Sequence, residues 1–164
     1  MTEIFAKPAV SAIIEKIEDG TRYILLQRRQ KESSDGSNGL IEVVGGKIRE
    51  YENIFDALRR EVREETGLYI TEILGEKERR EVEVNGARVI SFEAFCTVQN
   101  LSGVYSLMMQ TFICRAKGEL VCSTNETVDV HWERAEVIRT MLETEPQKIF
   151  PLDILPLKKY LEQL

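Results

Sequence analysis

The sequence has few of the residues that crosslink small folds or bind transition metals, with three cysteines and one histidine among 164 residues. Cys96, Cys114 and Cys122 form an odd set without the paired spacing of a zinc site or a disulfide framework. No apolar run approaches the length of a membrane span, and the first residues, MTEIFAKPAV, lack the apolar segment of a signal peptide. We therefore expect a cytoplasmic protein with no membrane partner.

Basic residues are also in short supply, with 22 Lys and Arg against 28 Asp and Glu, which gives a formal net charge of −6. This balance argues against a nucleic-acid partner, because binding to a phosphate backbone requires a basic face. An anionic small-molecule substrate would need local neutralisation by a metal ion and a few Lys or Arg side chains. The length and the 43% hydrophobic content predict one domain over residues 1–164. The oligomeric state stays open, a homodimer included.

The most informative stretch is residues 45–68, where a glycine pair and a short charged loop precede an amphipathic helix. Its apolar residues recur at the spacing of one helical face, at Ile54, Phe55, Leu58 and Val62. Asn53 is a suitable N-cap, and Gly67 suits the left-handed residue that ends a helix. The pattern therefore predicts a helix between these two residues.

Three glutamates gather on one side of this helix. Glu61, Glu64 and Glu65 are separated by three and four residues, so their carboxylates share a face beside the apolar stripe. Like charges at this spacing repel one another, and clustered carboxylates without His or Cys select hard divalent ions such as Mg²⁺ or Mn²⁺. The alternative is a solvated acidic face on which Arg60 pairs with Glu64.

The spacing of the charged residues and glycines decides between these alternatives. The pattern is Gly46, five residues, Glu52, seven residues, Arg60-Glu61-Val62, one residue, Glu64-Glu65, one residue, Gly67-Leu68. It resembles the box of the Nudix hydrolases. A chance match has a probability on the order of 10⁻⁷ for average composition. This resemblance covers 23 residues and is looser elsewhere.

The resemblance implies roles for several residues. The metal ligands would be Glu61, Glu64, Glu65 and the Gly45 carbonyl, holding Mg²⁺ (or Mn²⁺). Glu61, Glu64 and Arg60 would be catalytic, with Arg60 orienting a carboxylate of the box. The general base varies within the family, and Glu61 and Glu126 are both candidates, with Asp129 as the competitor of Glu126. His131 is the only histidine, and we interpret it as structural.

Four residues outside the acidic set would contact the substrate. Arg28 and Arg29 end a strand upstream of the box, where Nudix enzymes often place a basic residue against substrate phosphate. Charged residues leaving a sheet are the alternative interpretation. Gly46 and Lys47, in the stretch GGKI, are the other two predicted substrate contacts.

Periodicity and turn residues place the remaining elements. We predict strands at residues 8–17, 21–27, 40–44, 68–74, 81–84, 87–95, 106–116 and 126–132, a polar loop at 31–39, and helices at 135–142 and from about residue 156. Asp19-Gly20 and Asn85-Gly86 are hairpin signals. This order resembles the Nudix fold, an α/β (α+β) protein with an α/β/α sandwich and a mixed central sheet.

The predicted function is metal-dependent hydrolysis of a nucleoside diphosphate-linked substrate. The stretches LLQRR and GGKI resemble the branch that cleaves nucleoside triphosphates to monophosphate and pyrophosphate. Alternatives are another phosphoanhydride, such as a nucleotide sugar, a dinucleoside polyphosphate or a coenzyme, and a non-catalytic module that senses nucleotides. In the family that the sequence resembles, the ADP-ribose branch commonly has a proline well after the box. This sequence has none between Pro8 and Pro146, which counts against ADP-ribose.

Overall fold

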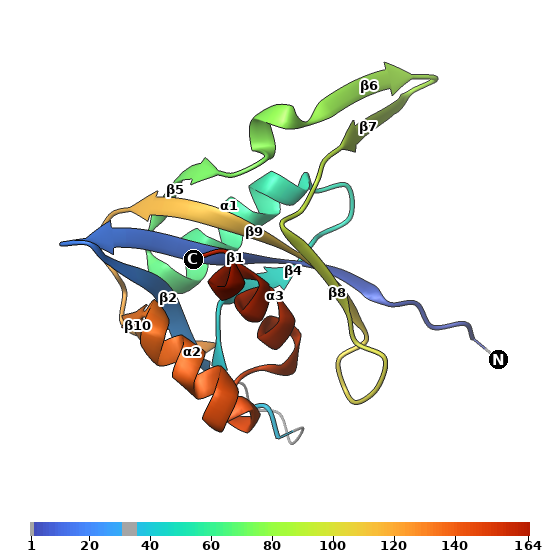
Figure 1. Ribbon diagram of the computed structural model, residues 1–164. Coiled ribbons are helices and arrows are strands. Elements are labelled where there is room, and N and C mark those ends of the chain that lie inside the picture. Colours follow the sequence, from blue (N-terminus) through green and yellow to red (C-terminus); the bar gives the residue numbers. More distant parts are fainter. Residues whose placement is uncertain (1, 31–35) are drawn as a thin grey trace.

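The computed structural model describes residues 2–30 and 36–164, which fold into two sheets and three α-helices (Figure 1). Residues 31–35 of the predicted polar loop lie outside the described residues. The large sheet contains β1 (Lys7–Glu18), β2 (Thr21–Arg29), β3 (Ile41–Glu42), β4 (Val44–Lys47), β5 (Tyr69–Ile73), β8 (Cys96–Gln99), β9 (Leu107–Lys117) and β10 (Thr127–Arg134). The helices are α1 (Ile54–Thr66), α2 (Ala135–Thr144) and α3 (Pro151–Glu162).

The large sheet is mixed, as predicted. Its main path runs β10-β2-β1-β9-β5, and β3, β4 and β8 pair with β2, β1 and β9 respectively. β1 and β9 are parallel, with Ser11 opposite Thr111, whereas the other pairs are antiparallel. The hydroxyls of these two residues share a buried hydrogen bond of 2.8 Å. The parallel pair therefore forms the centre of the sheet.

Helices cover both faces of this sheet, which confirms the predicted α/β/α sandwich. α1 lies against one face, and α2 and α3 lie against the other (Figure 1). Neighbouring β1 residues divide between the layers, because Ile14 packs in the α1 core and Ile13 packs in the core of α2 and α3. None of the described helices is long and apolar enough to cross a membrane.

The helix α1 has the predicted ends. The Asn53 side chain accepts a 2.9 Å hydrogen bond from the Phe55 amide at its start. Gly67 ends it in the left-handed conformation, with φ of 76°. The apolar stripe is buried and its two ends are fixed, so the glutamates on the adjoining face have a set direction.

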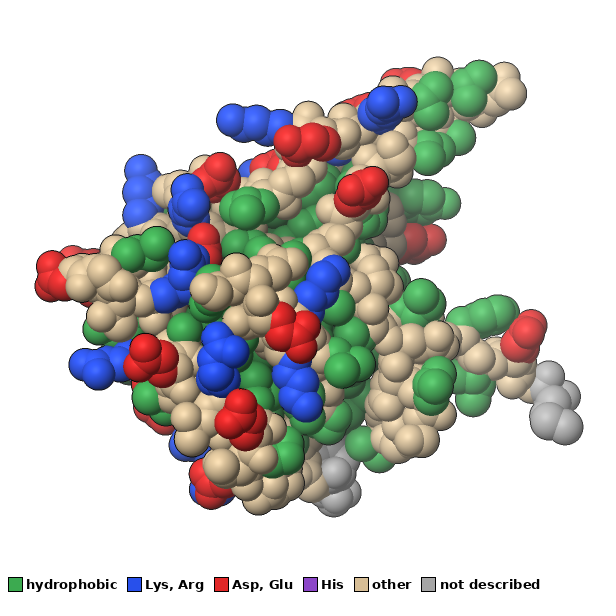
Figure 2. All heavy atoms as spheres, viewed as in Figure 1, with side chains coloured by type: hydrophobic (Ala, Val, Ile, Leu, Met, Phe, Trp, Pro, Cys, Tyr) green, Lys and Arg blue, Asp and Glu red, His purple; other side chains and the backbone are tan. Residues whose placement is uncertain are grey.

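Both predicted hairpins are present. Asp19-Gly20 and Asn85-Gly86 have positive φ at both positions, as a tight hairpin turn with right-handed strand twist requires. The second hairpin joins β6 (Arg80–Val84) and β7 (Ala87–Ser91), which form a separate ribbon that projects from the body (Figure 1). Apolar side chains stand exposed on this ribbon at Val82, Val84 and Val89 (Figure 2).

Three boundaries differ from the prediction. The strand expected at 40–44 is split at Val43 into β3 and β4, because its first part pairs with β2 and its second with β1. The strand expected at 87–95 ends at Ser91, and β8 follows as an unpredicted strand. The last helix begins at Pro151 rather than near Pro156, because Pro151 occupies a helix start, where a missing N–H costs nothing.

Candidate active site

The three box glutamates line one hollow with a loop from the far end of the chain. Glu61, Glu64 and Glu65 come from α1, and the loop before β10 contributes Thr124, Asn125 and Glu126. The hollow has a volume of about 240 Å³, and we call it the acidic hollow. Glu126 and the box glutamates, which lie some 60 positions apart in sequence, thus line the same hollow.

Arg60 holds the acidic face to the loop that precedes α1. Its Nε and Nη2 donate to the two carboxylate oxygens of Glu52 at 2.7 and 2.9 Å, and its Nη1 donates to Glu61 at 2.5 Å. The contact with Glu64 is longer, at 3.4 Å. The hydrogen bonds from Arg60 lower the pKa of Glu52 to about 2. Arg60 therefore orients Glu61, and pairing with Glu64 is its minor contact.

Both glycines of the pair in β4 have close neighbours. A Cβ on Gly46 would overlap the carboxylate of Glu61, and a Cβ on Gly45 would press against the backbone of β1 at Val10 and Ser11. Gly45 and Gly46 pair with Ser11 and Val10 in the sheet. The Glu61 carboxylate therefore lies directly against the Gly46 backbone.

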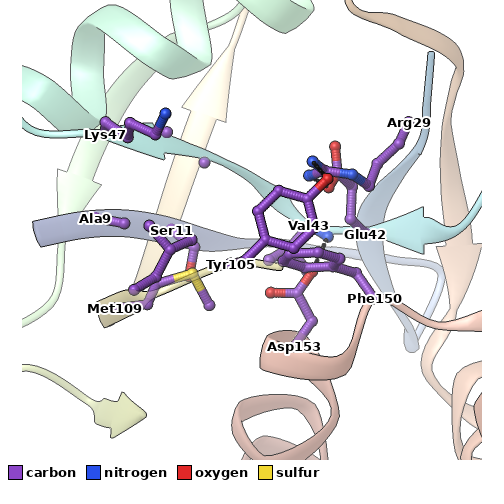
Figure 3. A pocket seen from close by; sticks show the side chains of 13 residues that line it. Ala9, Ser11, Arg29, Glu42, Val43, Lys47, Tyr105, Met109, Phe150 and Asp153 are labelled. Carbon is purple, nitrogen blue, oxygen red and sulfur yellow. Dashed lines mark hydrogen bonds and ion pairs between the residues drawn. The ribbon is translucent and has the colours of Figure 1, made fainter. Parts of the chain in front are cut away.

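A second cavity, also of about 240 Å³, lies beside β4, and we call it the β4 cavity (Figure 3). Its walls are largely apolar side chains, at Ala9, Tyr105, Leu107, Met109 and Phe150. Polar groups meet it at Ser11, Arg29, Glu42, Lys47 and Asp153. Gly46 lines it too, so this residue borders the β4 cavity and touches an acid of the acidic hollow.

The two arginines at the end of β2 point to different places. Arg29 is buried, lines the β4 cavity, and donates to Glu42 at 2.6 Å while stacking 4.4 Å from the centre of the Phe150 ring. Arg28 is half-buried and binds Asp129 at 3.1 Å. Arg28 lines neither the β4 cavity nor the acidic hollow, so its assignment as a phosphate contact stays a prediction.

Asp129 and His131 are also separate from both spaces. Asp129 has a φ of 54° and is held by Arg28. The His131 ring nitrogen Nδ1 lies 2.7 Å from the Asp129 carbonyl. Neither residue lines the acidic hollow, which favours Glu126 over Asp129 as the acid that faces the box.

The structure adds two buried polar residues that the sequence analysis missed. Gln27 of β2 is fully buried, and its Nε2 donates to Glu65 at 2.8 Å and to Glu42 at 3.3 Å. Asp153 of α3 accepts a 2.9 Å hydrogen bond from the Val43 amide, and burial raises its pKa well above the ordinary value. A polar residue after the apolar run ILL of β2 was the available signal for Gln27.

The donor set of the acidic hollow fits a hard divalent cation. Four carboxylates line it, and none of its described lining residues is His or Cys. Among residues 2–30 and 36–164, no three Asp, Glu, His or Cys side chains already converge as ligands of one ion. Arg60 and Gln27 donate hydrogen bonds to Glu61 and Glu65 respectively. Among the three box glutamates, Glu64 has the most exposed side chain, at 55%.

The comparisons with known proteins identify the family. The family model of the NUDIX domain matches residues 6–152, so the chain belongs to the Nudix family. Its solved relatives include MutT hydrolases, and the chain is a Nudix pyrophosphohydrolase, a class consistent with hydrolysis of nucleoside diphosphate-linked substrates. A search of curated proteins found no match.

Solved structures share the fold at low sequence identity. The NUDIX domain of Shewanella oneidensis NrtR, complexed with ADP ribose, is 18% identical over 99% of this chain and 90% of its own, with a TM-score of 0.64. The MutT NUDIX hydrolase of Burkholderia pseudomallei is 19% identical over 79% and 84%, with a TM-score of 0.57. The E. coli ORF135 protein is 23% identical over 97% and 91%, with a TM-score of 0.55.

Proposed function

We propose that the protein hydrolyses a nucleoside triphosphate to the monophosphate and pyrophosphate, with Mg²⁺ or Mn²⁺ held in the acidic hollow. The observation that carries this proposal is the placement of Gly46, which borders the β4 cavity and also touches Glu61. A substrate with its base and sugar in the cavity would extend its phosphates past Gly46 toward the acids. The apolar walls, including Phe150 and Tyr105, suit the faces of a planar base.

Each residue of the site has a separate proposed role. Glu61, Glu64 and Glu65, together with the Gly45 carbonyl, are the proposed ligands, and a bound divalent ion supplies charge neutralisation and a water of lowered pKa. Arg60 keeps Glu61 oriented through their 2.5 Å contact. Lys47 lines the β4 cavity, and its proposed role is to neutralise phosphate (Figure 3).

Glu126 is the proposed general base, because it faces the box glutamates across the acidic hollow. Glu61 remains the alternative, but Arg60 already holds its carboxylate. Arg29 contributes as a wall of the cavity that is paired with Glu42, and Arg28 remains a candidate for a more distant phosphate contact.

A panel of substrates tests the reaction. Nucleoside triphosphates, nucleotide sugars including ADP-ribose, and dinucleoside polyphosphates are incubated with Mg²⁺, and phosphate and pyrophosphate are measured separately. We expect pyrophosphate from at least one triphosphate. If monophosphates are released only from nucleotide sugars or dinucleoside polyphosphates, the substrate belongs to one of those alternative classes. Binding without turnover across the panel would favour a sensing module.

The proposal includes a small-molecule nucleotide substrate, no nucleic-acid partner and a cytoplasmic location. The net charge of −6 and the three free cysteines support these points. A homodimer remains open, and sedimentation analysis measures it directly.

A further inference from the structure

Gln27 is a buried polar residue at the meeting point of the two candidate sites. It follows three buried apolar residues of β2 and has no exposed surface. Its amide nitrogen bridges two carboxylates, donating to Glu65 Oε2 at 2.8 Å and to Glu42 Oε1 at 3.3 Å. Glu65 lines the acidic hollow, and Glu42 lines the β4 cavity. One amide group therefore connects both.

The other end of this amide is unsatisfied. Gln27 Oε1 is the buried side-chain oxygen that has no hydrogen-bond partner among the described residues. Turning the amide over would place this oxygen against the carboxylates and lose both hydrogen bonds. A buried acceptor without a donor destabilises a fold. The orientation with Nε2 toward the acids is the one that keeps both hydrogen bonds.

The hydrogen bond from Gln27 also sets the position of Glu65. Glu65 is 7% exposed and Glu42 is 6% exposed, so two acids stand close together with little solvent to screen them. Arg29 pairs with Glu42 at 2.6 Å. For Glu65, the Gln27 amide is a donor that comes from another element, across 38 positions of the chain. Carboxylates that ligate metals depend on such partners for their orientation.

We propose that Gln27 is a positioning residue that holds Glu65 in place for a divalent cation. Its second hydrogen bond, to Glu42, fixes the amide so that Nε2 faces the acids and Oε1 faces away from them. The inference rests on the proposed function, since it assumes that the acidic hollow binds the cation. It adds a residue outside the box to the machinery of that site.

A purely structural role makes a different prediction. If Gln27 only satisfies two buried acids, its removal lowers the free energy of unfolding and leaves cation affinity unchanged. If it positions Glu65, cation affinity falls as well. Mn²⁺ binding to the full chain without nucleotide, followed by electron paramagnetic resonance, separates these outcomes because it does not depend on turnover.

The main variant is Gln27→Met, which fills the same volume without the amide. We expect its Mn²⁺ affinity to fall about 10–100-fold relative to the wild type. Tyr160→Phe is the matched control, because Tyr160 donates a buried hydrogen bond to Glu15 and lines neither space. We expect it to lose stability and to keep wild-type Mn²⁺ affinity.

A second variant and a double-mutant cycle complete the test. Gln27→Asn keeps an amide on a side chain one methylene shorter, so it folds more readily but no longer reaches Glu65, and we expect a similar loss of affinity. In a Glu65→Gln background the Gln27 change should have little further effect, because both act on one ligand.

The outcomes distinguish the inference from the proposed function. A wild-type chain that binds no Mn²⁺ refutes the metal site, and the inference with it. A wild type that binds Mn²⁺, with Gln27 variants within twofold of it, overturns the inference alone. An equal loss of affinity with and without Glu65 also overturns it, because Gln27 would then act through another group.

Discussion

Arg60 binds both carboxylate oxygens of Glu52, with donor–acceptor distances of 2.7 and 2.9 Å. The pair is largely buried, with side-chain exposures of 17% and 16%. Glu52 also accepts a 2.9 Å hydrogen bond from the Arg49 amide. Because Arg60 contacts Glu61 as well, this ion pair connects the loop before α1 to a proposed metal ligand. The ion pair is therefore part of the site and differs from an isolated surface ion pair.

This ion pair predicts how stability responds to acid. Arg60 lowers the pKa of Glu52 from 4.5 to about 2. An acid whose pKa is lowered by folding adds stability that is complete above its unfolded pKa and is lost as pH falls. We therefore expect Glu52→Gln to be less stable than wild type by about 1–3 kcal/mol at pH 7. Urea unfolding should show this difference shrinking between pH 5 and pH 2.

Glu143→Gln, at an exposed residue of α2, is the control. It should change the free energy of unfolding very little at any pH. A difference between wild type and Glu52→Gln that stays constant from pH 5 to pH 2 would contradict the assigned pKa.

The glycine pair predicts two different defects. Gly46→Ala would place a methyl group in the space of the Glu61 carboxylate, whereas Gly45→Ala would press on the backbone of β1. Carboxylates move more easily than a paired strand. We therefore expect Gly46→Ala to keep most of its thermal stability and to lose about 10–100-fold in Mn²⁺ affinity. Gly45→Ala should lower the melting temperature.

Equal effects of the two glycine substitutions on melting temperature and Mn²⁺ affinity would show that β4 responds as one unit. In that case Gly46 would have no specific relation to Glu61.

The sequence predicted the elements whose signals are local. The Asn53 cap, the Gly67 end and the apolar stripe define α1 within its own 15 residues, and both hairpins follow from two-residue turns. The direction of the box glutamates followed from helical spacing alone. Such features depend on residues that are neighbours in the chain, so a pattern is sufficient to find them.

The parts that were missed depend on contacts between distant residues. Asp153 reaches the Val43 amide from 110 positions away, and Gln27 reaches Glu65 across 38. The split of residues 40–44 arises because two strands compete for one segment. The different directions of Arg28 and Arg29 follow from strand alternation, which the sequence contained, but only the fold shows which side holds the β4 cavity.

Glu64 offers the most direct test of the acidic face. It is the most exposed of the box acids, and its contact with Arg60 is long at 3.4 Å. Glu64→Gln should therefore leave the metal-free melting temperature unchanged or slightly higher, because a like-charge repulsion is removed. Hydrolysis should fall at least about 10²-fold, a typical loss for a positioned catalytic group. Glu136→Gln on α2 is the exposed control.

A Glu64→Gln enzyme that retains activity but unfolds without metal would show that this acid is structural. The assignment of the acidic hollow as a cation site would then be wrong.

Asp153 predicts a pH response of the opposite sign. Burial, with Glu42 nearby, raises the pKa of this carboxyl group, and the Val43 amide opposes the shift. An acid with a raised pKa favours the fold at low pH and loses that contribution as pH rises from about 4 toward the folded pKa. Asp153→Asn keeps an oxygen for Val43 without a titrating group. The melting temperature of Asp153→Asn relative to the wild type should therefore rise by a few degrees as pH increases from 4 to 8.

Asp153→Ala separates the acid from the hydrogen bond, because it leaves the Val43 N–H unsatisfied and enlarges the β4 cavity. It should be destabilised at every pH, by about 1–3 kcal/mol. Thermal unfolding of the three proteins from pH 4 to pH 8 measures both effects. Parallel curves for wild type and Asp153→Asn would show that Asp153 is ionised in the fold. Arg29, whose positive charge opposes the raised pKa of Asp153, would then neutralise Asp153 as well as Glu42. A nucleotide base in the β4 cavity would then meet a hydrogen-bond acceptor at Asp153 instead of a donor.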